Sequence, residues 1–197
     1  MGRALASIPL AAALLAGCGG GHATTTSPAA APPPAATTAP AGGALRPEAG
    51  AAAAGDIPDN QMFLMFRNAS AGYSIKYPEG WATSGSGKTV TFRDKNNVVR
   101  VVVEHGGLPG VATARRDLGA SVRQAPKPFT VSGAPAVKAV YATESARNAV
   151  TGKRVTLVVD RYYLTHAGRV AIVDLGTPEG VDNVDAYRLM VESFRWK

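Results

Sequence analysis

The segment at residues 82–89, ATSGSGKT, has the residue types of a phosphate-binding loop, with alanine in place of the usual first glycine. Such a loop binds phosphates only where it leads into a helix, because the N-terminal amide groups of the helix hold the phosphate oxygens. Here the motif is followed by apolar residues at a spacing of two, Val90 and Phe92, which is typical of a strand. We therefore predict a hairpin turn at residues 85–87 and no nucleotide site.

The other residues with catalytic or metal-binding side chains are scattered along the chain. The histidines are His22, His105 and His166, and the patterns HExxH and GxSxG are absent. Glu104 precedes His105, but adjacent residues of a strand point to opposite faces, so we expect no proton-transfer pair. The turn at residues 94–97 begins like a calcium loop but is followed by valine where a further ligand is needed. We predict no catalytic, cofactor-binding or metal-binding residue.

The N-terminus has the pattern of an export signal. One basic residue, Arg3, precedes an apolar run that is too short to span a bilayer but suits a secretory signal. The sequence Leu-Ala-Gly-Cys that ends at Cys18 resembles the lipobox of bacterial lipoproteins. The resemblance implies a signal peptide at residues 1–17, a diacylglyceryl group on the Cys18 thiol and a fatty acyl chain such as palmitate on its amine. Cys18 is the only cysteine, so an intramolecular disulfide is excluded.

A segment of low complexity follows the lipobox. Of the 37 residues at 19–55, 33 are Ala, Gly, Pro, Thr or Ser, so the segment has almost nothing to bury. We predict that residues 18–55 form a disordered tether, with a typical end-to-end distance of about 35 Å. The formal net charge of the whole chain is +7, and the basic residues are distributed along the sequence rather than concentrated in one block. This pattern favours a solvated basic surface and no nucleic-acid site.

Periodic apolar patterns predict one folded domain at residues 56–197. Strands are expected at residues 62–66, 73–77, 81–83, 89–94, 98–105, 129–133, 136–143, 154–166 and 169–176, and helices at residues 111–123 and 184–194, the second with Asp182 as its N-cap. The valine-rich strand at residues 98–105 is expected to be central and covered on both faces. The order of elements predicts an α+β fold, an antiparallel β-sheet flanked by helices as an α/β/α sandwich.

The last hairpin allows a prediction of register. If Ala167 and Gly168 form a two-residue loop, His166 pairs with Arg169. Counting back along both strands then places Tyr163 opposite Ile172 and Arg161 opposite Asp174. We expect a half-exposed ion pair between Arg161 and Asp174 that favours this register.

Several segments of the domain resemble the PsbP domain, which has the PsbP/Mog-like fold. They are GYSIKYPEGW at residues 72–81, VTFRD at 90–94, NNVVRVVVE at 96–104 and VESFRW at 191–196. The resemblance covers about residues 60–197 and implies an antiparallel sheet between helices that serves as a binding module. Members of the family include extrinsic photosystem II subunits that help to retain calcium and chloride, a Ran-binding import factor and bacterial lipoproteins. The family has no catalytic residue set to carry over.

The leading hypothesis is an exported lipoprotein, anchored to the outer face of the cell membrane or in the periplasm. Its domain would act as a monomeric, non-catalytic binding or accessory module for a membrane or envelope protein, or for an envelope polymer. The alternative is an envelope hydrolase or metal-dependent enzyme with dispersed site residues, and a third possibility is an extrinsic photosystem II role in calcium or chloride retention. A deep pocket with clustered carboxylates or histidines favours an enzyme, whereas a broad, shallow surface favours a binder.

The lipobox interpretation predicts that anchoring depends on Cys18 alone. The Cys18→Ser variant should leave the detergent phase in a phase-partition assay, because a serine hydroxyl does not receive the diacylglyceryl group and no other thiol exists. Its thermal unfolding should match that of the parent chain. Retention of the variant in the detergent phase would show that the anchor is misassigned.

Overall fold

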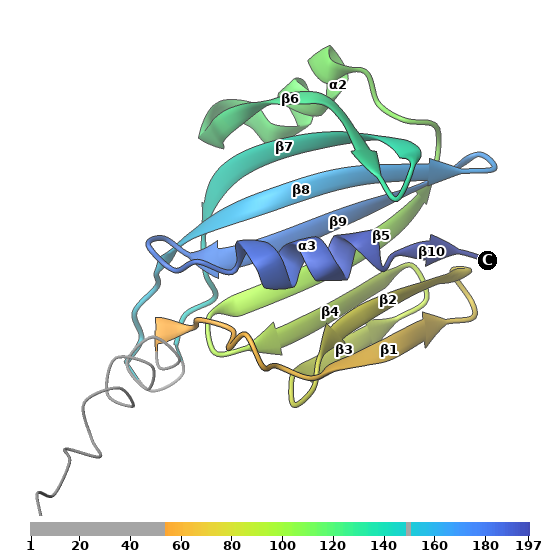
Figure 1. The fold of residues 1–197 in the computed structure, drawn as a ribbon. Helices are drawn as coiled ribbons and strands as arrows, with labels where there is room; N and C mark the ends of the chain where they lie inside the picture. The colour runs from red at the N-terminus through yellow and green to blue at the C-terminus, as the bar shows by residue number, and fades with distance from the viewer. Residues whose placement is uncertain (1–53, 149–150) are drawn as a thin grey trace, which may run out of the picture. The chain divides into compact units, whose positions relative to one another are not determined.

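A computed structural model describes residues 54–148 and 151–197, which belong to one compact unit. Cys18, the predicted signal peptide and nearly all of the predicted tether lie outside the described residues. Within them, no helix is long and apolar enough to cross a membrane. The described part is dominated by antiparallel β-structure, with two α-helices, as an α+β fold (Figure 1).

Seven strands form the larger sheet. Their order is β3 (Ala82–Ser86), β4 (Thr89–Asp94), β5 (Asn97–His105), β9 (Arg169–Pro178), β8 (Thr156–His166), β7 (Ala134–Glu144) and β6 (Val122–Val131), and all neighbours are antiparallel. The central place of β5 agrees with its valine-rich sequence. The expected cover on both faces is wrong, however, because Val99, Val101 and Val103 are buried on one face whereas Arg100 on the other is half exposed.

The first two strands do not join the large sheet. β1 (Phe63–Asn68) and β2 (Tyr73–Pro78) form a second, three-stranded sheet with the short β10 (Arg195–Trp196), in the order β1-β2-β10. Helix α3 (Val184–Glu192) packs against β2 in the same layer (Figure 1). The sequence predicted one sheet, because an alternating pattern identifies a strand but not its partner.

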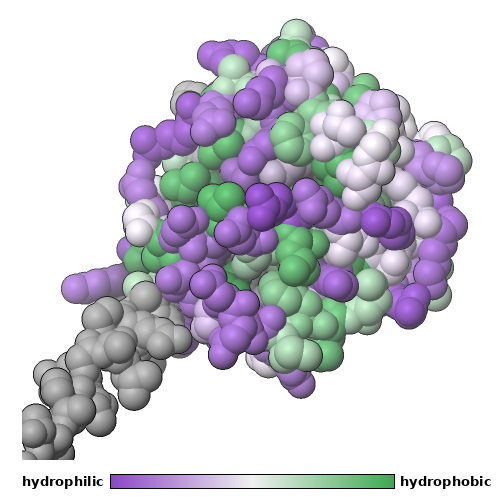
Figure 2. Space-filling view, in the orientation of Figure 1, coloured by the Kyte–Doolittle hydropathy of each residue, from purple (hydrophilic) through white to green (hydrophobic). Residues whose placement is uncertain are grey.

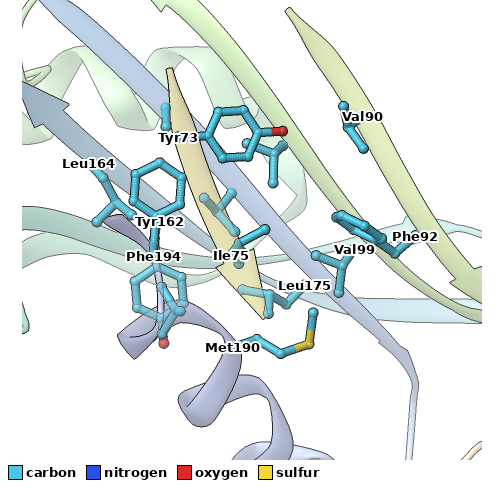
Figure 3. Close-up of a cluster of buried hydrophobic side chains, with 14 of the residues drawn as sticks. Tyr73, Ile75, Val90, Phe92, Val99, Tyr162, Leu164, Leu175, Met190 and Phe194 are labelled. Carbon is cyan, nitrogen blue, oxygen red and sulfur yellow. The ribbon is translucent and has the colours of Figure 1, made fainter. Parts of the chain in front are cut away.

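The main hydrophobic core lies between this layer and one face of the large sheet. Tyr73 and Ile75 of β2 are fully buried against Phe92, Val99 and other residues of the large sheet, and Met190 of α3 completes the cluster (Figure 3). The rings of Tyr77 and Phe92 stack with centroids 4.7 Å apart. Burying such large side chains is the main stabilising contribution to this two-layer packing.

The first predicted helix is shorter than expected. Helix α2 covers Val111–Leu118, ends at Gly119, and is followed by the short 3-10 helix η1 (Gly119–Ser121) and by β6. Gly119 has a φ of 62°, a conformation that glycine adopts without steric cost and that ends the helix. The apolar Val122, which continued the helical spacing, is therefore a strand residue. Ala114 of α2 packs against a second cluster on the opposite face of the large sheet.

The phosphate-loop-like segment is a hairpin, as the sequence predicted. β3 and β4 are joined by a two-residue turn at Gly87 and Lys88, slightly later than expected, since Gly85 already belongs to β3. A Cβ atom at Gly85 would lie 2.4 Å from the carbonyl oxygen of Thr89, so the strands approach closely there. No helix follows this turn, which removes the structural basis for phosphate binding.

The predicted register of the β8–β9 hairpin is confirmed, with Arg161 opposite Asp174 and Tyr163 opposite Ile172. Arg161 Nε and Nη2 donate to the two carboxylate oxygens of Asp174 at 2.6 and 2.8 Å, and Arg100 Nη2 reaches the same carboxylate at 3.3 Å. The side chains of Arg161 and Asp174 are only 13% and 8% exposed, so the pair is more buried than expected. Burial opposes the charge of Arg161, but its hydrogen bonds and the charge of Asp174 prevail and raise its pKa.

Asp174→Ala should destabilise the domain by about 3 kcal/mol, because it leaves the largely buried Arg161 without its carboxylate. Arg100→Ala should cost less than about 1 kcal/mol, since that side chain is half exposed. Urea unfolding followed by tryptophan fluorescence measures both values. Equal losses in the two variants would contradict a dominant role of the Arg161–Asp174 pair.

Candidate functional site

An open groove with a volume of about 1350 Å³ lies between α3 and the β1–β2 sheet. Three segments line it: residues 56–59, the outer face of β1 and β2, and the outer side of α3. Figure 2 shows hydrophobic surface over β1 and beside α3, bordered by hydrophilic residues. The groove is therefore a broad surface feature rather than a closed cavity.

Apolar side chains at the groove remain open to solvent. Met65 of β1 is 43% exposed, and Leu189 and Val184 of α3 are 38% and 67% exposed. On β1 this exposure follows from the unbroken apolar sequence: Phe66 packs on the core, so Met65, its neighbour, must point the other way. Leu64, which is also exposed, alternates with Met65 and lies on the other face of the strand.

Charged side chains surround these apolar residues. Asp56, Asp59, Asp182, Asp185 and Glu192 supply carboxylates, and Lys76, Arg188 and Arg195 supply cations. Several have local partners: Arg188 pairs with Asp185 at 2.8 Å, and an Asp182 carboxylate oxygen accepts from the backbone N–H of Val184. Lys76 makes no ion pair with any described residue. The rim thus presents both signs of charge around an apolar floor.

The groove does not contain the residues considered earlier for catalysis or metal binding. His105 and His166 lie at the ends of β5 and β8, and Glu104 and His105 are both exposed on opposite faces of their strand. Among residues 54–148 and 151–197, no three His, Cys, Asp or Glu side chains are placed to hold a metal ion. The groove residues were missed because a site of this kind has no motif. The sequence signal for it was the apolar run at residues 62–66.

A buried amide network closes one end of the groove. The Asn183 side chain accepts from Ile57 N at 2.8 Å and donates to Gly55 O, Asn97 Oδ1 and Thr177 Oγ1. Asn97 Nδ2 donates to the same Gly55 oxygen. Asn183, rather than the predicted Asp182, is the N-cap residue of α3, and Asn97, which ends the predicted turn at residues 94–97, is the first residue of β5 and is buried. The network fixes residues 55–57 to the domain.

The seryl side chain at the other end of α3 joins the helix to the small sheet. Ser193 Oγ accepts from Lys76 N at 2.8 Å and donates to Met190 O at 2.6 Å. The N–H of Lys76 points away from β1, toward the edge of β2 that also pairs with β10, and Ser193 lies just before β10 in the chain. The two walls of the groove are thereby held in a fixed relation.

The fold has neighbours among solved structures. The chain is similar to cyanobacterial PsbP (CyanoP) from Synechocystis sp. PCC 6803, with 16% identity and a TM-score of 0.49, over 73% of this chain and 98% of that one. The domain resembles PsbP in its fold. A protein from Bacteroides thetaiotaomicron VPI-5482 is similar with 12% identity and a TM-score of 0.47, over 68% of this chain and 48% of that one. The chain matches no protein-family model and no curated protein. A likeness at this level transfers no function.

Asn183→Ala should release residues 55–57 from α3. It leaves the largely buried N–H of Ile57 without an acceptor, which should lower the free energy of unfolding by about 2 kcal/mol. Amide exchange at Ile57 should accelerate by more than that at core residues of β9. Asp185→Asn, a matched change on the exposed side of α3, should cost only a few tenths of a kcal/mol. Similar losses in both variants would show that the network does not hold this segment.

Proposed function

We propose that the domain is a non-catalytic binding module for another protein and that the groove between α3 and the β1–β2 sheet is its contact surface. The observation that carries the proposal is the exposure of Met65, Leu189 and Val184 on the walls of one groove. Apolar side chains gathered in one concavity and rimmed by polar residues are typical of protein interaction sites.

The energetics suit a modest interaction. Full burial of a side chain such as Leu, Met or Val contributes about 1.5–3 kcal/mol, and these three side chains are already partly covered. A partner that covers them gains roughly 1 kcal/mol from each, before the cost of association. The charges of the rim add orientation and partner choice more than affinity. Such a balance fits an accessory module that attends another protein.

Membrane attachment completes the proposal. Anchoring through lipidated Cys18 would place the domain on the outer face of the cell membrane or in the periplasm, with residues 18–55 as its tether. A tethered module reaches a millimolar effective concentration near its membrane partner, which compensates for weak intrinsic affinity. The lipobox pattern supports this part of the proposal.

The enzyme alternative has less support from the groove. Its carboxylates are distributed along the rim, and those of Asp182 and Asp185 are engaged in a backbone hydrogen bond and an ion pair. A photosystem role is not part of the proposal, because the likeness to cyanobacterial PsbP concerns fold alone.

Photo-crosslinking in intact cells tests the groove. A photoreactive residue in place of Leu189 should give a discrete adduct with one protein, because its side chain lies on the groove wall. The same substitution at the exposed Arg115 of α2, which packs on the opposite face of the large sheet, is the control and should give none. Val184→Glu should weaken the Leu189 adduct while leaving thermal stability unchanged, since Val184 is 67% exposed. Equal adducts at Leu189 and Arg115 would contradict the proposal.

A further inference from the structure

The outer edges of the two sheets differ in their protection against an added strand. β6 carries Pro126, Lys127 and Pro128 and two shifts of register, and β3 consists of small and polar exposed residues. Prolines, lysines, irregular register and short strands are the usual means by which proteins block edge-to-edge pairing. β1 has none of these along its apolar run, and the first charged residue is Arg67.

The register of β1 determines which backbone groups remain free. Met62 O accepts a hydrogen bond from Glu79 N, which makes these two opposite residues a hydrogen-bonded pair. In an antiparallel ladder every second pair is of this kind, so Leu64 and Phe66 of β1 also bond to β2. Phe63, Met65 and Arg67 then direct their N–H and C=O groups away from β2. The strand has no neighbour on that side within the described residues.

The residues of β2 that face these positions support the assignment. Pro78, opposite Phe63, has no N–H to donate to β1, and Lys76, opposite Met65, donates its N–H to Ser193 Oγ on the other side of β2. Three residues of β1, spaced by two, thus offer paired donors and acceptors to an extended chain.

The side chains of β1 specify what such a chain would carry. Met65 and Arg67 are exposed on the outer face of the strand, and Phe63, two residues before Met65, lines the groove while packing partly against the core. Arg67 has no ion pair with any described residue. A complementary strand would be apolar opposite Phe63 and Met65 and acidic opposite Arg67. β1 itself contains no acidic residue, so a second copy of β1 offers Arg67 no carboxylate.

We propose that β1 receives an extended segment of the partner protein as an added strand, apolar along most of its length and acidic where it meets Arg67. This inference rests on the proposed function, since it describes how the same partner is recognised, and it adds the adjoining strand edge to the groove as a contact surface. Main-chain hydrogen bonds would supply the attachment, and the alternating side chains would supply the selectivity.

Residue-resolved amide exchange of the full chain provides a direct test. The probe is a synthetic peptide of alternating valine and threonine with glutamates at its N-terminal end, which an antiparallel strand places beside Arg67. At about ten times its Kd, the peptide should slow exchange roughly tenfold at Phe63, Met65 and Arg67. Exchange at Leu64 and Phe66 should not change, because their N–H groups already bond to β2. This alternation is specific to strand addition.

Substitutions in β1 then test the strand edge, with a control far from it. Met65→Pro removes one outward N–H without breaking the β1–β2 ladder and should weaken peptide binding about tenfold. Met65→Val, which keeps the N–H, is the matched control and should stay within about twofold of the parent chain. Arg67→Glu should reverse the preference between the glutamate peptide and an otherwise identical lysine peptide. Arg115→Glu, an exposed change on α2 at the opposite face of the large sheet, should leave peptide affinity unchanged.

Each contrary result has a distinct meaning. Protection confined to groove residues such as Leu189 would overturn strand addition while leaving the proposed binding function intact. Alternating protection that appears without peptide and grows with protein concentration would identify a second copy as the occupant and overturn the partner peptide. No protection at either place, together with no crosslink at Leu189, would overturn both proposals.

Discussion

The arrangement of β2 is the constraint on which the rest of the domain depends. Its inner face buries Tyr73 and Ile75 completely against the large sheet, and both of its edges are occupied, one by β1 and the other by β10 and Ser193. β2 can therefore neither rotate nor accept another strand. β1 is therefore the edge strand of its sheet, and α3 is held in a fixed position against β2. The groove and the free strand edge both follow from how this one strand is held.

Hydrogen bonds between buried polar groups fix the register of strands and the position of chain segments that apolar packing alone would not determine. Apolar contacts are non-directional, whereas hydrogen bonds between buried groups are satisfied in one arrangement only. Asp174 accepts from two arginines and so penalises a slip between β8 and β9. Asn183 and Asn97 both donate to the carbonyl oxygen of Gly55, which fixes where the chain joins the domain. This contact includes Gly55, the last residue of the predicted tether, in the fold.

Local sequence patterns predicted the features that are determined by residues close together in the chain, such as hairpins and their register. The β3–β4 hairpin was identified from the alternation of Val90 and Phe92, and the register of β8 and β9 from the Ala167-Gly168 loop, because a short loop determines its pairing by geometry. The separate sheet of β1 and β2 was missed, and its third strand comes from far along the chain, where Arg195 of β10 pairs with Ser74. The end of α2 was misplaced because Val122 fits both a helical and an alternating spacing.

The candidate site was beyond sequence reasoning for a related reason. An apolar residue in a strand predicts burial, and the unbroken apolar run at residues 62–66 did not show which of its residues would be exposed. The register decides it: Phe66 is paired with the fully buried Ile75 on the inner face, whereas Met65, which is 43% exposed, is paired with Lys76 on the outer face. Exposure of this kind carries a risk of aggregation, which the contact proposed for this surface would remove. A flexible tether raises the local concentration of a partner but does not orient it. In the proposed complex, orientation would come from β1 and the groove, where free backbone groups and apolar side chains lie beside Lys76, and from Arg67 near the end of β1.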